Sequence, residues 1–298
     1  MNIIEKIEKS KIGKVEKNVP LKKCTTYKAG GIAEVIVTPK NVEKLILLLK
    51  LLKENNTNFK ILGNGSNLLF SDEPYKDVLI KLTELDKCEI KDTVVKVGAG
   101  ASLISVAMKT AKEGLTGMEF ATGIPGTVGG AVYMNAGAYK TDMGYVVTSI
   151  KVLTPDLEIK TMYNKELDFH YRTSFLQKNK DYICLEATIS LVKGNPEEIM
   201  ELIDSRKQRR IESQPLEYPS AGSVFRNPEG DFAGRLIEEI GYKGKSIGGA
   251  KVSEKHANFI INNGGATGEE IKELINEIKD KVKEKYNIEL KVEQEFVE

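Results

Sequence analysis

The sequence predicts an α+β protein with a large first unit and a smaller C-terminal unit, and three observations support this. Residues 31–62 read as strand, helix and strand, which is a β-α-β pattern. A long helical segment at 195–213 runs into the Pro- and Gly-rich stretch 214–230, which marks a candidate boundary. Residues 267–286 carry their apolar side chains on one helical face, as expected of a helix packed on a sheet.

The elements of the first unit follow from hydrophobic periodicity. The expected strands are 31–39, 59–62, 77–82, 93–101, 147–153, 158–163 and 182–192. A mostly buried helix is expected at 41–56, and a second at 102–114, where Ser102 is a possible N-cap and Gly114 ends the helix.

The C-terminal elements are introduced by helix 195–213, which has Asn195 as N-cap and Pro196 in its first turn. Beyond it we expect helix 231–240, strand 259–262, helix 267–286 and a last strand at 288–297. The apolar face of helix 267–286 consists of Ile271, Leu274, Ile275, Ile278 and Val282.

Bulk properties narrow the class of protein. A length of 298 residues predicts about two domains, and a net charge of +1 gives no general field for nucleic acid or anionic membranes. The longest apolar run, 45–52, is too short to span a bilayer, and the N-terminus lacks the apolar core of a signal peptide. Cys24, Cys88 and Cys184 are widely spaced and fit no zinc or disulfide pattern, so we expect reduced thiols in the cytoplasm.

Two glycine-rich turns stand out in the first unit. "GNGSNLL" (63–69) directly follows an expected strand. The second turn, 123–130, lies in the stretch "EFATGIPGTVGGAVYMNAGAY" (119–139), which contains five glycines and one charge. Backbone N–H groups in such turns form concave anion sites, and Ser66, Asn67 and Thr122 add side-chain donors. The spacing matches neither a P-loop nor a Rossmann fingerprint. Each turn alone could be an ordinary tight turn, whereas the pair favours a large, neutral-faced cofactor with a diphosphate.

A set of motifs, taken together and in order, resembles a known family. They are "GNGSNLL" (63–69), "TGIPGTVGGAVYMNAGAY" (122–139), "FHYRTSFL" (169–176), "YPSAGSVFRNP" (218–228), "IGGAKVSEKHANFIIN" (247–262) and "VEQEF" (292–296). The resemblance is to the UDP-N-acetylenolpyruvoylglucosamine reductases, also called UDP-N-acetylmuramate dehydrogenases, in their compact form without an inserted tyrosine loop. It covers the chain from about residue 20 onward.

The resemblance implies an FAD-binding fold of the vanillyl-alcohol-oxidase (PCMH) type at 30–194, and a smaller α+β substrate-binding domain at 205–298. It implies FAD as cofactor. Because no histidine precedes His170, we expect FAD to be bound without a covalent bond. The implied FAD-binding residues are Gly63, Asn64, Gly65, Ser66, Asn67, Gly117, Thr122, Gly123, Ile124, Gly126, Gly129, Gly130, Ala136, Gly137 and Arg210. Asn64, Lys140 and Val297 depart from residues usual in the family.

The implied reaction uses NADPH to reduce FAD, and then transfers hydride to the enolpyruvyl carbon of UDP-N-acetylglucosamine enolpyruvate. Negative charge then develops on the substrate carboxylate, which calls for a cation, a further polar group and a proton donor. The resemblance assigns these roles to Arg172, Glu295 and Ser223. Strand alternation alone cannot choose Glu295 over Glu293, since both would share one face. Without the family match, Arg172 could equally form a surface ion pair and Ser223 could be a turn residue.

Further residues are candidates for the substrate pocket. Tyr171, Arg226, Asn227 and His256 are the expected substrate contacts, with Asn258 beside them. His256 could instead be a structural histidine. The basic end of helix 195–213 could instead be a solvent-exposed face without a ligand.

The implied role is a cytoplasmic step of peptidoglycan precursor synthesis, and thus of cell-wall biogenesis, cell shape and division. We expect no metal, no nucleic acid, no membrane insertion and no obligate protein partner. Two rival readings are another flavoprotein of the same fold, such as an alcohol or lactate oxidase, and a nucleotide-sugar-binding module without catalysis.

Overall fold

The computed structural model describes residues 3–298, which form two compact units. The first unit comprises residues 3–17, 35–64 and 77–207, and the second comprises 18–34, 65–76 and 208–298. The domain limits expected from the sequence, 30–194 and 205–298, are continuous ranges and stay a prediction.

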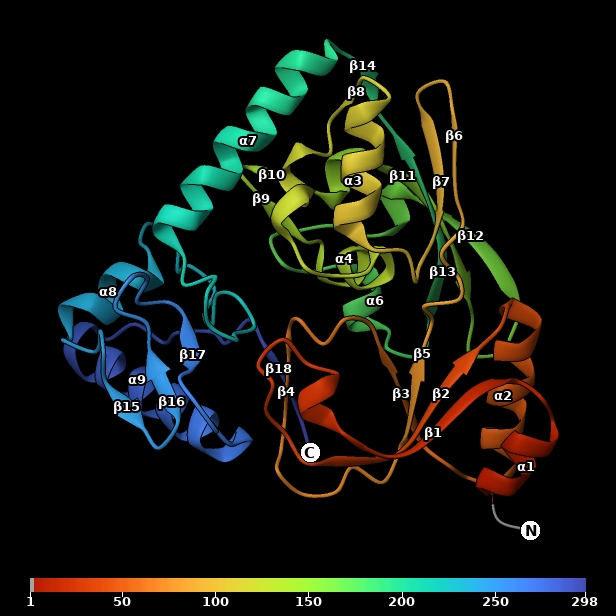
Figure 1. Ribbon diagram of the computed structural model, residues 1–298, viewed down its shortest axis with the longest axis horizontal. Coiled ribbons are helices and arrows are strands. Elements are labelled where there is room, and N and C mark those ends of the chain that lie inside the picture. Colours follow the sequence, from red (N-terminus) through yellow and green to blue (C-terminus); the bar gives the residue numbers. More distant parts are fainter. Residues whose placement is uncertain (1–2) are drawn as a thin grey trace. The chain divides into compact units, whose positions relative to one another are not determined.

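A four-stranded sheet lies in the N-terminal part of the chain (Figure 1). Its strands, in spatial order, are β1 (Gly13–Pro20), β2 (Ile32–Pro39), β5 (Val78–Lys81) and β3 (Phe59–Leu62). The predicted β-α-β pattern is confirmed, because β2 and β3 both pair in parallel with β5 and helix α2 (Val42–Glu54) connects them. Asn41 caps α2 by accepting a hydrogen bond from the Lys44 N–H at 2.9 Å. Helix α1 (Ile3–Lys9) and the 3₁₀ turn η1 (Leu21–Lys23) lack a periodic pattern long enough to be read from sequence.

The first unit also contains an antiparallel five-stranded sheet. Its spatial order is β12 (Ile159–Tyr163), β11 (Val147–Leu153), β13 (Ile183–Ser190), β7 (Val94–Gly98) and β6 (Cys88–Lys91). Around it lie α3 (Leu103–Lys112), η2 (Glu119–Gly123), α4 (Val128–Met134), α5 (Met143–Val146), η3 (Asn164–Glu166) and α6 (Phe175–Lys178). Two short ladders complete the unit, β8 (Leu115–Thr116) with β14 (Val192–Lys193) and β9 (Gly137–Ala138) with β10 (Thr141–Asp142). The predicted caps are confirmed, since Ser102 accepts from the Ser105 N–H and Asn195 from the Glu197 N–H before α7 (Pro196–Ser213).

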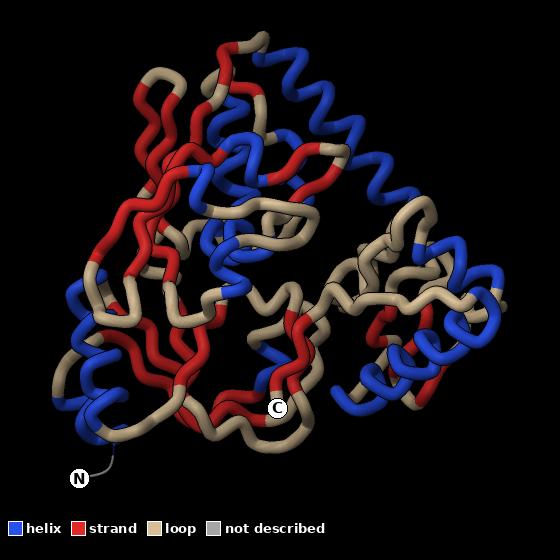
Figure 2. The backbone as a smooth tube through the Cα atoms, turned by 180° about the vertical axis from the view of Figure 1, so that it is seen from behind, coloured by secondary structure: helices blue, strands red, loops and turns tan. Residues whose placement is uncertain are grey.

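The second unit packs helices α8 (Ala233–Glu239) and α9 (Gly268–Tyr286) with a small antiparallel sheet. The sheet consists of β15 (Ser246–Ile247), β16 (Ala250–Val252) and β17 (Ile260–Asn262), and α9 lies alongside it (Figures 1 and 2). The predicted apolar face of α9 is confirmed, because Ile271, Leu274, Ile275, Ile278 and Val282 are all fully buried. Thr267 and Glu270 form a capping box at its start.

The strand predicted at 288–297 is wrong for most of its length, because only β18 (Glu295–Val297) forms, in parallel with β4 (Leu68–Phe70). The residues before β18 pair with a different segment. The Arg226 N–H donates to the Lys291 carbonyl and the Glu293 N–H to the Val224 carbonyl. The change of partner occurs at Gln294, whose buried side chain bonds with the Tyr27 hydroxyl. No helix among residues 3–298 is long and apolar enough to cross a membrane.

Candidate active site

The first glycine-rich turn packs tightly against its surroundings. A Cβ on Gly63 would lie 2.9 Å from the Thr127 Oγ1, and the Asn64 side chain donates to the Pro125 carbonyl at 3.1 Å. Gly65 has φ +61°, and a Cβ there would lie 2.1 Å from the Cys24 carbonyl oxygen. Only glycine fits these positions without displacing the neighbouring chain, so the protein's own packing explains part of the glycine pattern.

The two glycine-rich turns differ in how their backbone N–H groups are used. In the second turn, the N–H groups of Gly126, Gly129 and Gly130 donate to Ile124 O, Ala99 O and Thr127 Oγ1 at 2.8, 2.8 and 3.3 Å. In the first turn, within the part of the chain that the structure describes, the N–H groups of Asn64, Gly65 and Ser66 donate to no protein acceptor.

Successive N–H groups without protein acceptors, in a turn with a left-handed glycine, form a concave site for an anion. Within the first unit the two turns lie against each other, because Thr127 is close to Gly63 and the Pro125 carbonyl accepts the hydrogen bond from Asn64.

The other predicted FAD-binding residues of the first unit are fixed by local hydrogen bonds. Gly117, at φ +126°, donates its N–H to the buried Glu119 carboxylate at 3.0 Å, and the Thr122 hydroxyl donates to the Glu119 carbonyl. The Ile124 N–H donates to Ala121 O at 3.1 Å and the Ala136 N–H to Ala131 O at 2.8 Å. Gly123 ends the turn η2, and a Cβ on Gly137 would lie 2.4 Å from the Asp142 Cβ.

Lys140, one of the departures from the family pattern, lies in the turn between β9 and β10. Tyr139 and Lys140 both have positive φ, at 56° and 61°, which is the backbone of a two-residue hairpin turn. A glycine would adopt this conformation without strain, which explains why one is common there.

Arg172 stands at the tip of a tight turn in the first unit. His170 and Thr173 exchange both backbone hydrogen bonds at 3.0 Å, which leaves Tyr171 and Arg172 as the two tip residues. Arg172 has φ 54°, a left-handed conformation that is uncommon for this residue type and is often found at functional sites. Its Nη2 donates to the Gly137 carbonyl at 2.8 Å, and its guanidinium lies 5.1 Å from the centre of the half-exposed Tyr171 ring.

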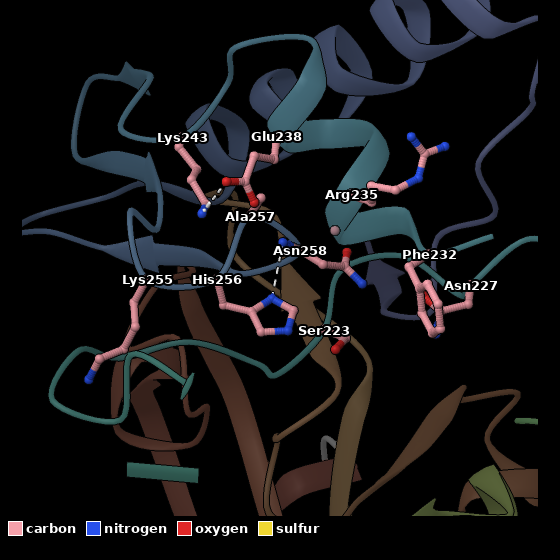
Figure 3. Close-up of a pocket in the computed structure, with 11 residues that line it drawn as sticks. Ser223, Asn227, Phe232, Arg235, Glu238, Lys243, Lys255, His256, Ala257 and Asn258 are labelled. Atoms are coloured by element: carbon pink, nitrogen blue, oxygen red, sulfur yellow. Dashed lines mark hydrogen bonds and ion pairs between the residues drawn. The ribbon is translucent and has the colours of Figure 1, made fainter. Parts of the chain in front are cut away.

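Ser223 lines a pocket of the second unit with a volume of about 360 Å³ (Figure 3). The other lining residues are Asn227, Phe232, Gly234, Arg235, Glu238, Lys243, Lys255, His256, Ala257 and Asn258. Buried Asn258 fixes the segment that carries the serine. Its carbonyl accepts from the Val224 N–H, its Oδ1 accepts from the Phe225 N–H at 2.9 Å, and its Nδ2 donates to Phe225 O at 2.8 Å.

His256 and Ser223 point toward each other in this pocket (Figure 3). The His256 Nδ1 accepts a hydrogen bond from the Asn258 N–H at 3.2 Å, so the neutral ring carries its proton on Nε2. Burial lowers the pKa of His256, which favours this neutral form. The ring therefore presents an N–H donor to the pocket at neutral pH.

The charged residues of the pocket are paired with protein groups. Lys243 forms an ion pair with Glu238 at 2.7 Å, and Lys255 donates to the Ile211 carbonyl at 2.9 Å. Arg235 is paired with Asp231 and Glu239. Exposed ion pairs such as Lys243–Glu238 contribute little free energy.

Three further predicted residues of the second unit have identifiable structural partners. Asn227 lies at the edge of the pocket, where its side chain accepts from the Ala233 N–H at 3.1 Å and so helps to begin α8. Arg226 pairs through its backbone with Lys291. On α7, the Arg210 Nε donates to the Gln214 Oε1 at 3.1 Å.

Glu295 is the first residue of β18 and lies beside the end of the first glycine-rich turn. Its N–H donates to the Asn67 carbonyl at 2.9 Å, and the Asn67 side chain donates to the Glu293 carbonyl at 3.1 Å. Asn67 therefore holds the C-terminal segment, and Glu295 is paired in register with Leu68. The same segment is bonded to Val224, the residue after Ser223. Within the second unit, hydrogen bonds thus connect the C-terminal segment that carries Glu295 with Asn67 and with the serine segment.

Sequence reasoning missed Phe232, Arg235, Glu238, Lys243 and Lys255 as pocket residues. They come from α8 and its start and from loops that flank the small sheet, and of the five only Lys255 lies within a motif that the sequence analysis identified. Among residues 3–298, no three His, Cys, Asp or Glu side chains gather as a metal site would require.

Comparisons with known proteins agree over nearly the whole chain. Residues 33–163 match an "FAD binding domain" family, and residues 214–297 match "UDP-N-acetylenolpyruvoylglucosamine reductase, C-terminal domain". The chain is 46% identical to the reductase of that name from Anoxybacillus flavithermus, over 98% of this chain and 97% of the relative. It is 43% identical to the Bacillus subtilis reductase, over 99% and 98%.

Solved structures give the same result. The crystal structure of UDP-N-acetylenolpyruvylglucosamine reductase from Thermus caldophilus matches with a TM-score of 0.83 and 35% identity, over 96% of this chain and 99% of that one. The structure of Phl p 4.0202, a glucose dehydrogenase, matches with a TM-score of 0.52 at 12% identity, over 66% of this chain and 45% of that one, and shows the fold alone.

The fold and the matched domains define an FAD-dependent oxidoreductase, with a PCMH-type FAD-binding fold followed by a smaller α+β domain. The predicted fold class and cofactor are thereby confirmed. The chain belongs to the UDP-N-acetylenolpyruvoylglucosamine reductase family.

Proposed function

We propose that this protein reduces UDP-N-acetylglucosamine enolpyruvate to UDP-N-acetylmuramate with NADPH as the reductant, in a cytoplasmic step of peptidoglycan precursor synthesis. The observation that supports this most is the match to reductases over nearly the whole of both chains, at 43–46% identity for the two relatives described. We assign FAD binding to residues 30–194 and substrate binding to residues 205–298. The product feeds cell-wall biogenesis, and so the activity serves cell shape and division.

FAD, when bound, supplies hydride transfer from the nicotinamide to the enolpyruvyl carbon. The chain's own contribution begins with the 63–67 turn, where the N–H groups of Asn64, Gly65 and Ser66 bind the diphosphate. Such contacts are reversible, and the absence of any histidine before His170 supports non-covalent attachment.

Arg172 binds the substrate carboxylate. A guanidinium can form two parallel hydrogen bonds with a carboxylate. Charge that develops on the carboxylate during reduction strengthens this interaction, so Arg172 stabilises the transition state more than the ground state. The left-handed backbone at Arg172 and its hydrogen bond to Gly137 hold the side chain ready for that role.

Glu295 supplies the further polar group at the developing enol. A carboxyl that donates a hydrogen bond to this charge must be protonated, which burial beside the substrate would favour. The β18 pairing with Leu68 and the bond to Asn67 fix its backbone.

Ser223 donates the proton to the carbon next to the one that accepts hydride. The serine O–H is a weak acid, so it needs an acceptor as basic as an enol-like carbon and a donor that stabilises the oxygen left behind. The Nε2–H of neutral His256, which faces Ser223 in the pocket, is suited to the second requirement (Figure 3).

The pocket around Ser223 binds the nucleotide end of the substrate. Lys243 and Lys255 can exchange their present surface partners for phosphate oxygens. Asn227 adds a polar side chain at the edge, and Phe232 provides an exposed aromatic face for a base or sugar.

The experiment that tests the proton step is Ser223→Ala, with Ser220→Ala from the same segment as the matched control. Each half-reaction is followed by stopped-flow absorbance of the flavin, and solvent deuterium incorporation is measured in the product. Ser223→Ala should bind FAD and be reduced by NADPH normally, while turnover falls by ~10²-fold or more. Ser223→Cys should retain more activity than Ser223→Ala, because a thiol also gives a proton. Turnover at the wild-type rate in Ser223→Ala would show that the donor is another group.

A further inference from the structure

We propose that Asn135 is a positioning residue for the reaction, because its carboxamide holds the turn that carries Arg172 against the segment that follows α4. The inference rests on the proposed role of Arg172 as the carboxylate-binding cation. Asn135 itself is 1% exposed, so it acts through Arg172 and not by contact with substrate.

The Asn135 side chain bridges two segments of the first unit. Its Nδ2 donates to the His170 carbonyl at 2.8 Å, and its Oδ1 accepts from the Gly144 N–H at 2.9 Å. One end must donate and the other must accept, so an amide is required. A carboxylate has no N–H or O–H to offer His170, and it would face a carbonyl oxygen with its charge.

The backbone of Asn135 also favours this residue type. It ends α4 with φ 43°, ψ 55°, which is the left-handed conformation that asparagine tolerates better than most residues with a side chain. The sequence "MNAGAY" therefore has a local structural reason for its asparagine, and this conformation aims the carboxamide at the Arg172 turn.

Two further contacts join residues 133–137 to the segment that carries Arg172, and a third braces that segment internally. The Arg172 Nη2 donates to Gly137 O, and the Ser174 hydroxyl donates to Tyr133 O at 2.7 Å. The Gln177 Nε2 donates to the Arg172 carbonyl at 3.1 Å. Residues 133–137 thus meet the Arg172 turn at successive points, and Asn135 supplies the contact nearest the base of the turn.

Position matters here because the turn carries the side chain proposed to bind the substrate carboxylate. Tyr171, at its tip, is 52% exposed, and Arg172 lies in a strained backbone conformation that needs support from its surroundings. A displacement of about 1 Å in a group that binds the reacting part of a substrate can lower a rate by ~10²-fold.

The test uses the FAD-loaded enzyme and compares Asn135→Asp with Asn164→Asp. Asn164 is a matched control, since its Nδ2 donates to Gly144 O and Val147 O in the same region, and among the described residues it forms no hydrogen bond with the Arg172 turn. We expect Asn135→Asp to slow flavin reoxidation by the enolpyruvyl substrate ~10- to 100-fold, with reduction by NADPH within about twofold of wild type. Asn164→Asp should leave both half-reactions within about twofold.

A double-mutant cycle separates positioning from a general structural role. If Asn135 acts through Arg172, then adding Asn135→Asp to Arg172→Lys should slow reoxidation less than threefold further. The inference would be overturned if the rate losses of the two single variants multiplied in full in the double variant. It would also be overturned if Asn135→Asp slowed both half-reactions equally. If Asn135→Asp does not fold, Asn135→Gly keeps the left-handed backbone and removes the bridge, with the same expected loss. An unimpaired Arg172→Lys would overturn the role of Arg172 and this inference with it. An impaired Arg172→Lys beside an unimpaired Asn135→Asp would overturn the positioning role alone.

Discussion

The variant Gly130→Ala tests whether Gly130 is needed to bind FAD or to pack the protein itself. Gly130 lies in α4 and is exposed. Apart from its chain neighbours and the backbone of its own helix, the one described heavy atom within 4 Å of an added Cβ is the Thr127 Oγ1, at 3.3 Å. Alanine is favoured over glycine in a helix by about 0.8–1 kcal/mol, so the FAD-free protein should gain about 0.5–1 kcal/mol of unfolding free energy. That gain corresponds to about 1–4 °C in Tm for a unit of this size.

The same methyl group should weaken FAD binding if Gly130 faces the cofactor. Forcing a methyl into a packed contact costs about 1–3 kcal/mol, which corresponds to a roughly 5- to 150-fold higher Kd for FAD. Gly129→Ala is the contrasting variant, because its Cβ would lie 2.9 Å from the Ala99 Cβ and should destabilise the FAD-free protein. The assays are urea unfolding of the FAD-free protein and titration by flavin fluorescence. A loss of FAD-free stability in Gly130→Ala would refute the packing argument, and an unchanged Kd would refute its place beside FAD.

The remaining predictions use single changes. Glu295→Gln should slow flavin reoxidation by substrate with FAD still bound; if Glu293→Gln does so instead, the assignment of the carboxyl is wrong. Because burial lowers the pKa of His256 below its usual 6.5, the unfolded chain binds more protons, and stability should fall as pH drops from 6.5 through the folded pKa. His256→Gln should flatten that slope in pH-dependent unfolding. Burial raises the pKa of Cys184 to about 12, so a thiol reagent at pH 8 should leave it unlabelled in the native protein and modify half-buried Cys88 first.

Strong periodicity explains where the sequence predicted the fold well. Helix α9 has a complete apolar face and a capping box. Both features are encoded locally in the sequence, and both are present in the folded chain. The last strand was overpredicted because alternation at 288–294 is compatible with a strand. The tertiary contacts of Gln294 decide which partner the chain takes, and no local pattern carries that information.

The candidate site was predictable where one motif contains its residues. "SAGSVF" and "KHANF" supplied Ser223 and His256, which line one pocket. Lys243 and Glu238 lie on separate elements without a motif, so only the fold brings them to that pocket. Asn135 lies within a motif, but the motif did not indicate its role. Its hydrogen-bond partner, His170, is 35 residues further along the chain, so only the folded structure brings the two together.

The glycine-rich segments required the structure for their interpretation. The sequence predicted that both turns present backbone N–H groups together. The described contacts give that property to Asn64, Gly65 and Ser66, while the N–H groups of Gly126 and Gly129 are bonded within the protein. A glycine can be required by the close approach of a ligand or of a neighbouring backbone atom, and the sequence alone does not distinguish these two causes.

The most direct test of the proposed reaction is an anaerobic titration followed by flavin absorbance. NADPH should bleach the bound flavin, and UDP-N-acetylglucosamine enolpyruvate added in stoichiometric amount should restore the oxidised spectrum with formation of UDP-N-acetylmuramate. A flavin that is bleached by NADPH but recovers only when oxygen is admitted would contradict the proposed substrate. A protein purified without flavin absorbance, and unable to take up FAD, would contradict the reaction altogether.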